Sequence, residues 1–530
     1  MEAPPGLLLW WEVPTFMFVV LIFTKTDADS SFFIEWSIFR PERKIQMTET
    51  IIPHWLTKQA ALSPEKTALE TMDGRQLSFK ELKETSTHFA YKLASTGVEP
   101  GDRVAMLSEN CVDMVIAIHA LSYLQAVAVF INTKLTSKEI NYQLKASQSM
   151  LLLQTKAMQE EKQIEFSDVY TYEEIWQEGA AVVELAEEIS LDMPFTMMFT
   201  SGTTGNPKAV LHTYGNHWWS AIGSALNLGL DKQDKWLLPL PMFHVGGLSI
   251  LIRSVVYGME IYLLEKYTPE HLLQAFTEKR VTIASIVTVM LRDLLQELEG
   301  AALPDHVRCL LLGGGAVPAP LLQQVKKHQL PLFQSYGMTE TSSQIVTLSE
   351  EDSLRKIGSS GKALFPASVH IKNPDDSGVG EIAVKGPMVF HGYDHQPEAT
   401  AESFSDGWFK TGDLGYKDSE GFLFVMERRT DLIISGGENI YPSEIENVLL
   451  AMQGVEEAAV VGESDDKWGQ VPAAFIVASL PLKETEMIER LKQELAAFKV
   501  PKHLLFVETL PKTASNKIQR HELAKRLKKA

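Results

Sequence analysis

Short apolar segments alternate with longer amphipathic segments along most of this chain, and this alternation restricts its fold more than any other feature. Arg103–Ser108 and Val127–Ile131 have the composition of strands, and Val112–Leu124 between them has that of a helix. Similar strands recur further along the chain, at Trp236–Pro239, Ile261–Leu264, Val281–Ser285 and Arg308–Leu312. Strands separated by helices predict βαβ units and parallel sheets, and therefore an α/β fold. In such sheets, ligands bind beyond the carboxyl ends of the strands.

Two helices of this region carry a start signal in the sequence. Ser78 with Glu81, and Thr136 with Glu139, have the spacing of a capping box. In that motif the Ser or Thr side chain accepts a hydrogen bond from the third backbone amide, and the Glu side chain reaches back. We therefore expect helices to begin directly after Ser78 and Thr136.

The pattern changes after about residue 358, where turns rich in Gly, Pro and Asp separate short strands. These strands are predicted at Ser368–Lys372, Gly380–Lys385 and Gly421–Met426, and they indicate a small β-barrel-like part. From about Asp431 the chain has elements of its own: a helix capped by Ser443, strands at Ala458–Val461 and Ala473–Val477, and a helix at Thr485–Phe498. We expect residues 47–430 to form a large N-terminal domain and residues 431–530 a small α+β C-terminal domain.

The first 46 residues differ from the rest of the chain. Residues 7–23 are almost all apolar, but Glu12 and Pro14 interrupt them, so the run is marginal for crossing a bilayer. A signal peptide would have a basic region before its apolar run, but no Lys or Arg precedes this one. A membrane anchor, a targeting peptide and an upstream extension from a too-early start are the three interpretations, and the sequence favours the extension.

Charge and cysteine content exclude several classes of protein. The formal net charge of the 530 residues is −19, because 49 Lys and Arg face 68 Asp and Glu. So acidic a chain, without a long basic run, is a poor partner for nucleic acid. Its two cysteines, Cys111 and Cys309, lie far apart and form neither a disulfide framework nor a structural zinc site. We expect a cytoplasmic protein without stable membrane association; whether it forms a homo-oligomer stays open.

A segment rich in glycine and hydroxyl groups, Thr200–Lys208 (TSGTTGNPK), follows the apolar strand Phe195–Phe199. Glycines let the backbone approach an anion, and the hydroxyls and the lysine surround it with donors. The segment is not a Walker A loop, since Ala209 rather than Ser or Thr follows the lysine. A flexible surface turn is the alternative, but the position directly after a buried strand favours a phosphate-binding loop.

Three further motifs carry groups suited to a nucleotide. Tyr336–Thr341 (YGMTET) combines an aromatic face, a hydroxyl and a carboxylate, which suit a base, a phosphate and a magnesium ion, although Thr-Glu is also a common helix start. Asp413, in a predicted turn with Thr411 and Gly412, could accept from both ribose hydroxyls or form an Asx-turn. Gly313–Gly315 ends a strand, where glycines allow a flat ring to pack on the backbone or form a tight turn.

Together these segments resemble the adenylate-forming superfamily of acyl-CoA synthetases, luciferases and peptide-synthetase adenylation domains. The resemblance extends from about Met47 to the end and includes the stretch from Arg428 (RRTDLIISGGENIYPSEIE) and the one ending at Lys517 (PKTASNK). Within the superfamily the chain looks most like the o-succinylbenzoate–CoA ligases of menaquinone biosynthesis. The segments that carry this closer resemblance are PLPMFHVGGLS, LLLGGGAVP and SYGMTETSSQIVTL.

The resemblance implies a reaction in two steps that uses ATP, Mg²⁺ and coenzyme A (CoA). The carboxylate of the acid attacks the α-phosphate of ATP, giving an acyl-adenylate and pyrophosphate, and the CoA thiol then displaces AMP. By resemblance, the β- and γ-phosphates are bound by Thr200, Ser201, Gly202, Thr203, Thr204, Gly205 and Lys208. The remaining contacts of ATP and the acid are implied for Tyr336 (adenine), Thr339 (α-phosphate), Glu340 (Mg²⁺), Asp413 and Arg428 (ribose), and Lys517 (the reacting carboxylate), with Gly313, Gly314 and Gly315 beside the base.

For the second step, the resemblance implies a mobile C-terminal domain that rotates about Thr430, where many relatives have Asp or Lys. Ser435, Gly436 and Gly437 would then line a tunnel for the pantetheine arm of CoA, and His244 would gate it. Succinylbenzoate has a second carboxylate, which needs donors when it is buried. The motifs offer no obviously free Lys or Arg for it, so the candidates are water molecules and His244, Ser342, Ser343 and Gln344.

Other activities stay open at this point. A ligase for another aryl acid or a fatty acid would use the same motifs. A stand-alone adenylation enzyme that loads a carrier protein is a further alternative. The intact Lys208, Glu340, Asp413 and Lys517 argue against a catalytically inactive scaffold.

Overall fold

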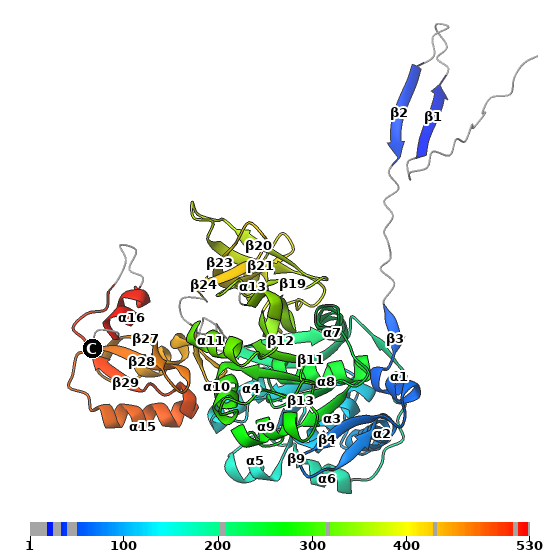
Figure 1. Cartoon of the computed structure of the whole chain (residues 1–530), viewed down its shortest axis with the longest axis horizontal. Coiled ribbons are helices and arrows are strands. Elements are labelled where there is room, and N and C mark those ends of the chain that lie inside the picture. Colours follow the sequence, from blue (N-terminus) through cyan, green and yellow to red (C-terminus); the bar gives the residue numbers. More distant parts are fainter. Residues whose placement is uncertain are drawn as a thin grey trace, which may run out of the picture. The chain divides into compact units, whose positions relative to one another are not determined.

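The computed structural model describes residues 18–24, 33–39, 50–201, 207–313, 319–353, 355–427, 432–511 and 518–527 (Figure 1). It divides into two compact units, residues 1–49 and residues 50–530. The smaller unit contains an antiparallel hairpin of β1 (Phe18–Thr24) and β2 (Phe33–Phe39). None of the described helices is long and apolar enough to span a membrane. The extension at residues 1–46 and the domain boundary at residue 430 stay predictions, and residues 428–431 lie outside the described residues.

One sheet of the larger unit has the strand order β12-β11-β7-β6-β8-β9. Its members β6 to β9 and β11 run parallel, as the alternating pattern predicts, whereas β12 runs antiparallel to β11. The strands are β6 (Arg103–Leu107), β7 (Val127–Ile131), β8 (Leu151–Gln154), β9 (Val169–Thr171), β11 (Pro194–Ser201) and β12 (Pro207–Thr213). A separate two-stranded antiparallel sheet pairs β3 (Ile51–Pro53) with β10 (Glu188–Ser190).

A second, larger sheet has the order β19-β18-β17-β16-β15-β13-β14-β4-β5. The strands from β17 to β4 in this order run parallel, and the edge strands β18, β19 and β5 are antiparallel. The strands are β4 (Thr67–Thr71), β5 (Gln76–Ser78), β13 (Lys235–Leu238), β14 (Glu260–Leu263), β15 (Ile283–Val287), β16 (Cys309–Gly313), β17 (Leu332–Met338), β18 (Ser343–Leu348) and β19 (Lys362–Ala363).

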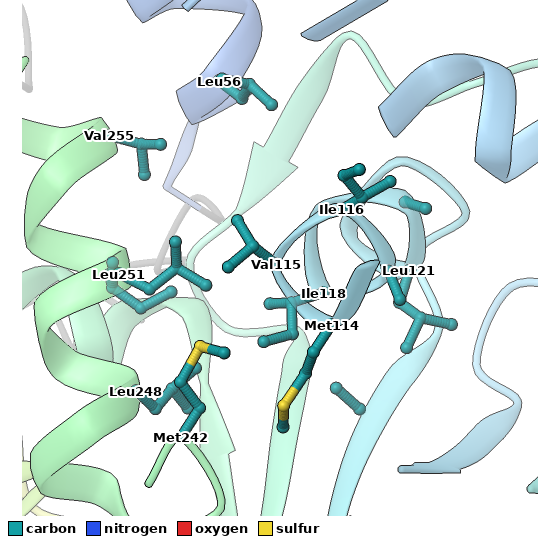
Figure 2. Packing of buried hydrophobic residues seen from close by; sticks show 14 of the residues in the cluster. Leu56, Met114, Val115, Ile116, Ile118, Leu121, Met242, Leu248, Leu251 and Val255 are labelled. Carbon is teal, nitrogen blue, oxygen red and sulfur yellow. The ribbon is translucent and has the colours of Figure 1, made fainter. Parts of the chain in front are cut away.

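Successive residues of the parallel strands enter different cores, so both faces of each sheet are covered. On β6, Val104 and Met106 belong to a core between the two sheets, and Ala105 and Leu107 to another on the far face. The central core also holds α1 (Trp55–Leu62), α2 (Phe79–Ala94), α3 (Val112–Tyr123) and α8 (Val245–Tyr257). Figure 2 shows side chains of α3 beside those of α8. The outer faces are covered by α4 (Ser137–Ala146) and α5 (Lys156–Glu161), and by α9 (Pro269–Thr277), α10 (Thr288–Glu297) and α11 (Ala319–Lys327).

The two predicted capping boxes are confirmed. Ser78 accepts from the amide of Glu81 at the start of α2, and Thr136 accepts from that of Glu139 at the start of α4. Both Glu side chains return a bond to the cap residue. Two further helices of this region are α6 (Tyr172–Gln177), which directly follows β9, and α7 (Tyr214–Leu228), which directly follows β12.

A third sheet forms the β-barrel-like part, with the order β20-β21-β23-β22 and β24 paired to β23. Its elements are β20 (Ser368–Lys372), β21 (Gly380–Lys385), α13 (Pro397–Ser403), β22 (Phe404–Ser405), β23 (Trp408–Lys417) and β24 (Leu423–Glu427). Thr411, Gly412 and Asp413 lie within β23, so the prediction that they form a turn is wrong. The pairing of β23 with β21 shifts register at this point, and Gly412 has a φ of 76°. The strand is therefore bent locally, and the residues that produce this bend have the composition of a turn.

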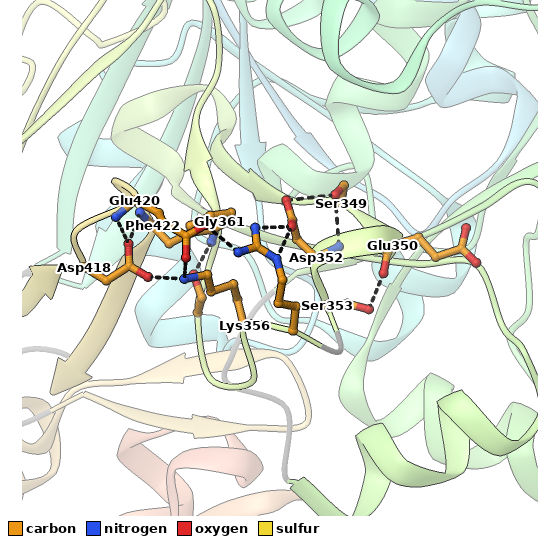
Figure 3. Close-up of polar contacts among 11 residues, drawn as sticks. Ser349, Glu350, Asp352, Ser353, Lys356, Gly361, Asp418, Glu420 and Phe422 are labelled. Carbon is orange, nitrogen blue, oxygen red and sulfur yellow. Dashed lines mark hydrogen bonds and ion pairs between the residues drawn. The ribbon is translucent and has the colours of Figure 1, made fainter.

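Ion pairs attach the segment after β18 to the hairpin between β23 and β24 (Figure 3). Lys356 Nζ lies 2.6 Å from Asp418 Oδ2 and also pairs with Glu420. Arg355 pairs with Glu420 and, at 2.7 Å, with Asp352 of the short helix α12 (Glu350–Ser353). These contacts connect the third sheet to the second, and thereby connect Asp413 to the strand that carries Tyr336.

The last sheet has the order β26-β25-β28-β27, with β29 paired to β28. Its elements are β25 (Ile433–Ser435), β26 (Glu438–Ile440), α14 (Pro442–Leu450), β27 (Val455–Asp465), β28 (Gly469–Ala478), α15 (Glu484–Glu494), η2 (Ala497–Lys499), β29 (His503–Phe506) and α16 (Arg520–Leu527). The predicted α/β fold, with a β-barrel-like part and an α+β C-terminal part, is confirmed.

Two predicted helix limits in this last part are wrong. The helix α14 begins at Pro442, so Tyr441 and not Ser443 precedes it, because proline is well suited to the first helical position. The helix α15 ends at Glu494 rather than Phe498. The amide of Ala496 instead donates to the Glu139 carboxylate, a contact between distant parts of the chain that sequence periodicity does not reveal.

Candidate functional site

A cavity of about 460 Å³ lies beyond the carboxyl ends of β13, β15, β16 and β17, where the sheet order predicts a ligand site. The lining includes Val287 at the end of β15 and Gly313 at the end of β16. Residues of the C-terminal part complete it, namely Leu432, Gly436, Gly437, Glu438, Asn439, Tyr441 and Trp468. The cavity is therefore built from both of the domains that the sequence predicts.

One side of the cavity brings together two residues of separate nucleotide motifs. The Tyr336 hydroxyl donates to Asp413 Oδ2 at 2.7 Å, and both side chains are buried. Thr411 Oγ1 accepts from the Asp413 amide, so the carboxylate is held on its own strand as well. A fixed carboxylate beside an aromatic ring suits the ribose and base of a nucleotide.

The short turn η1 (Thr339–Thr341) between β17 and β18 presents Thr339 and Glu340 to the cavity. Glu340 is 8% exposed, and Oε1 accepts from the Tyr393 hydroxyl at 2.9 Å. Among the described residues, no three or more His, Cys, Asp and Glu gather into a metal site. A single carboxylate nevertheless fits Mg²⁺, which is commonly held by one or two carboxylates together with substrate phosphates.

The predicted phosphate loop connects β11 to β12, which form an antiparallel pair with Thr200 opposite Lys208. Thr200 lines the cavity, and Lys208 Nζ lies 4.8 Å from the centre of the Tyr393 ring. The same Tyr393 therefore contacts both Lys208 and Glu340. Glu340 lines the cavity, whereas Lys208 and Tyr393 are not part of its lining.

His244 ends the loop before α8 and meets a carboxylate of the C-terminal part. Its Nε2 lies 3.3 Å from Glu438 Oε2, while Lys134 Nζ lies 2.8 Å from Oε1 and Asn132 donates to Oε2 at 3.0 Å. Glu438 is 5% exposed. Burial disfavours its charge, but the contacts with His244 and Lys134 outweigh burial and lower the pKa of Glu438 to about 2. Glu438 is not among the residues predicted from the sequence, although it follows the Gly-Gly pair directly.

Gly436 and Gly437 line the cavity with positive φ angles of 57° and 89°. A Cβ at Gly436 would lie 2.7 Å from the Trp468 ring, and one at Gly437 would lie 3.5 Å from Val287. Side chains at these two positions would therefore strain the backbone and narrow the passage. Ser435 is buried on β25, outside the cavity lining.

The residues predicted to contact the acyl group divide into two sets. Ser343 and Gln344 line the cavity. Ser342 does not: it is fully buried, and its hydroxyl donates to the Met388 carbonyl. Ser342 and Ser343 both have positive φ angles, 54° and 117°, a backbone feature that the sequence does not reveal.

Arg253 of α8 also lines the cavity, and the sequence analysis missed it. Its side chain is 1% exposed, stacks 5.3 Å from the Trp236 ring, and donates to Ser343 Oγ at 3.3 Å. Within the described residues, no carboxylate lies at ion-pair distance from it, and its Nε has no hydrogen-bond partner. The sequence does carry a signal, since Arg253 is the one charge in the apolar run Leu248–Val256. A buried cation without an acid partner is prepared for an anionic ligand.

Several predicted site residues lie outside the described residues, so the structure says nothing of them. They are Gly202, Thr203, Thr204, Gly205, Gly314, Gly315, Arg428, Thr430 and Lys517, together with the side chain of Ser201.

Comparison with known families gives two matches along the chain. The AMP-binding enzyme family matches residues 56–394, and the AMP-binding enzyme C-terminal domain matches residues 444–517. A 2-succinylbenzoate–CoA ligase of Oceanobacillus iheyensis is 51% identical over 483 residues, which is 90% of this chain and 100% of the relative.

Two solved structures of the o-succinylbenzoate CoA synthetase (MenE) of Bacillus subtilis, each 44% identical, are similar to different degrees. A double mutant bound to the product analogue OSB-NCoA has a TM-score of 0.85, covering 90% of this chain and 99% of that one. The complex with the acyl-adenylate OSB-AMP has a TM-score of 0.69, covering 89% and 98%. The arrangement of this chain is thus more similar to the complex with the product analogue.

Proposed function

Because this chain belongs to the family of AMP-binding enzymes, we propose that it is an ATP-dependent ligase that joins 2-succinylbenzoate to CoA. A carboxylate oxygen of the acid attacks the α-phosphorus of ATP, and the bond to pyrophosphate breaks. The CoA sulfur then attacks the acyl carbon of the adenylate, the bond to AMP breaks, and the thiol proton is released. The products are the acyl-CoA thioester, AMP and pyrophosphate. The thioester serves menaquinone biosynthesis.

One observation carries the choice of a diacid. The buried Arg253 faces the cavity without a carboxylate at ion-pair distance among the described residues. A monoacid would use its only carboxylate in the reaction and leave this guanidinium without an anion. 2-Succinylbenzoate brings a second carboxylate, which Arg253 and the adjacent Ser343 can bind as donors.

For the other residues we propose the roles in the first step that the family resemblance implies. Tyr336 and Asp413 hold the adenosine, and Thr339 contacts the α-phosphate. Glu340 holds Mg²⁺, which supplies positive charge at the phosphates when bound. Thr200 and Lys208 bind the outer phosphates, and the loop residues between them, Arg428 and Lys517 keep the roles that the family resemblance implies.

The second step uses the C-terminal domain, which we place at residues 431–530 after a hinge at Thr430. Gly436 and Gly437 leave room for the pantetheine arm, and His244 stands at its entrance beside Glu438. The higher TM-score with the product-analogue complex supports this assignment. We also propose a cytoplasmic location, which the free thiols of Cys111 and Cys309 suit.

The test is pyrophosphate release over a panel of acids, with and without CoA. We expect release with 2-succinylbenzoate and a thioester only when CoA is present. Benzoate and medium-chain fatty acids should be poorer by up to about 10⁴-fold, because they leave donors of the site unpaired. An equal or higher kcat/KM on a fatty acid would instead identify another acid–CoA ligase, and transfer to a carrier protein but not to CoA would identify an adenylation module.

A further inference from the structure

A buried histidine, His212, contacts the backbone of the turn that carries Thr339 and Glu340. His212 lies on β12, is 0% exposed, and its Nε2 is 2.7 Å from the Thr339 carbonyl oxygen. The same carbonyl accepts from the amide of Ser342 at 3.0 Å. These two bonds fix the plane of the peptide between Thr339 and Glu340, whose side chains both line the cavity.

The direction of each hydrogen bond behind the turn is determined by its acceptor. A carbonyl can only accept, so His212 Nε2 carries a proton and donates it. Burial lowers the pKa of His212 to about 4 and holds that of His217 well below its usual value, so both rings are neutral at pH 7. His212 Nδ1 is therefore an acceptor, and the Thr196 hydroxyl, 3.3 Å away, donates to it. The Thr196 oxygen in turn accepts from His217 Nε2 at 2.7 Å.

This chain of bonds joins two motifs that belong to different sheets. Thr196 on β11 and His212 on β12 are opposite each other in the strand pair whose ends flank the predicted phosphate loop. Thr339 follows β17 of the other large sheet. We propose that His212 is a positioning residue, which holds the Thr339–Glu340 turn at a fixed place relative to β11 and β12, the strands that flank the predicted phosphate loop. The proposal rests on the proposed function for its role in catalysis.

The first test separates the two half-reactions in single-turnover measurements. His212→Leu should slow adenylate formation about 10- to 100-fold, because a displacement of about 1 Å at a reacting group can have an effect of that size. Thioester formation from supplied acyl-adenylate should stay within about threefold, since the β- and γ-phosphates have left as pyrophosphate by then and no new bond to phosphorus is formed. His212→Gln keeps an N–H donor and should recover most of the loss.

His119 of α3 provides the matched control. It is also buried and has a lowered pKa, and its Nε2 has no hydrogen-bond partner among the described residues. His119→Leu should affect stability but neither half-reaction selectively. The proposal is overturned if His212→Leu leaves adenylate formation unchanged, or slows both halves equally as a purely structural loss would.

If His212→Leu does not fold, Thr196→Val removes only the hydroxyl and decides the question by the same half-reaction split. A second readout does not depend on activity. In protein labelled with ¹⁵N-histidine, NMR at pH 7 should show His212 and His217 protonated at Nε2 and not at Nδ1. The opposite tautomer of His212 overturns the proposal, whereas wild-type protein that shows the expected tautomers but releases no pyrophosphate with 2-succinylbenzoate contradicts the proposed function alone.

Discussion

Two buried charges line the same cavity, and they are treated differently by the rest of the protein. Glu438 of the C-terminal part has two partners from the N-terminal part, Lys134 Nζ at 2.8 Å and His244 Nε2 at 3.3 Å. Arg253 of α8 has no carboxylate at ion-pair distance within the described residues. The protein thus completes the environment of Glu438 itself and leaves that of Arg253 to be completed by a ligand.

This difference suggests separate roles for the two residues, Glu438 in docking of the C-terminal domain and Arg253 in recognition of the acid. Under the proposed domain rotation, the contacts of Glu438 form only when the two domains come together, so Glu438 should respond to domain position. Arg253 belongs to the N-terminal part, so under the same proposal it should respond to the substrate. The variants below test this separation.

The largest effect is expected for Arg253→Met. Leaving the second carboxylate of 2-succinylbenzoate in the cavity without its cation should lower kcat/KM by about 10³-fold, since removing one partner of a buried pair costs about 3–5 kcal/mol. The control is an analogue with hydrogen in place of the carboxylate that is not activated, on which wild type and variant should be similar. An equal loss on both acids would show that Arg253 supports the fold rather than the diacid.

Glu438→Gln should affect the other half of the reaction. It keeps the shape of the side chain but removes the charge that Lys134 and His244 contact. We expect thioester formation from supplied adenylate to slow about 10- to 100-fold, in line with the energies of buried charge-assisted bonds. Adenylate formation, measured by pyrophosphate release, should change little. Slower adenylate formation with normal thioester formation would reverse the assignment of Glu438.

A smaller loss in the same step is expected for Lys499→Met. Buried Lys499 lies 2.6 Å from Glu139 of α4 and 2.7 Å from Glu444 of α14, so it joins the N-terminal and C-terminal parts away from the cavity. We expect thioester formation to slow about tenfold, because only the docked arrangement loses the contact. Lys483→Met, which removes an exposed pair with Glu486, is the matched control and should change neither half-reaction. A tenfold loss in the control as well would mean that the loss of one positive charge anywhere in this domain, and not the loss of this contact, slows the step.

The smallest effect is a pH dependence of stability. The pKa of Glu438 is lowered from 4.5 to about 2, so its contribution is present above about pH 4.5 and is lost as the pH falls toward 2. The stability difference between wild type and Glu438→Gln should therefore shrink over that range, as measured by thermal unfolding at each pH. A difference that stays constant down to pH 2.5 would contradict the charged state of Glu438.

The parts of the fold that depend on local sequence could be predicted. Capping boxes at Ser78 and Thr136 need only four consecutive residues, and parallel strands follow from apolar runs between helices. The limits of α14 and α15 could not, because α15 ends where Ala496 turns to donate to Glu139, some 350 residues earlier. Periodicity within a window contains no information about such a partner.

The candidate site was predictable to the extent that it lies at strand ends. Tyr336, Glu340 and Asp413 come from motifs, and the order of the strands brings them to one cavity. Arg253 and Glu438 were not predicted, because their importance depends on burial and on partners in other elements. An arginine in an apolar helix is visible in the sequence, but only the structure places it against a cavity.

The unpaired burial of Arg253 links the substrate to the folding of the enzyme. A desolvated guanidinium lowers the free energy of unfolding, and a bound diacid restores what is lost, so ligand and native state stabilise each other. Replacement of Arg253 by an apolar residue should then give a protein that is more heat-resistant but has little activity on the diacid. In a cell, the half-life of the wild-type enzyme would rise with the supply of its acid. The abundance of the enzyme would then follow the flux through its reaction.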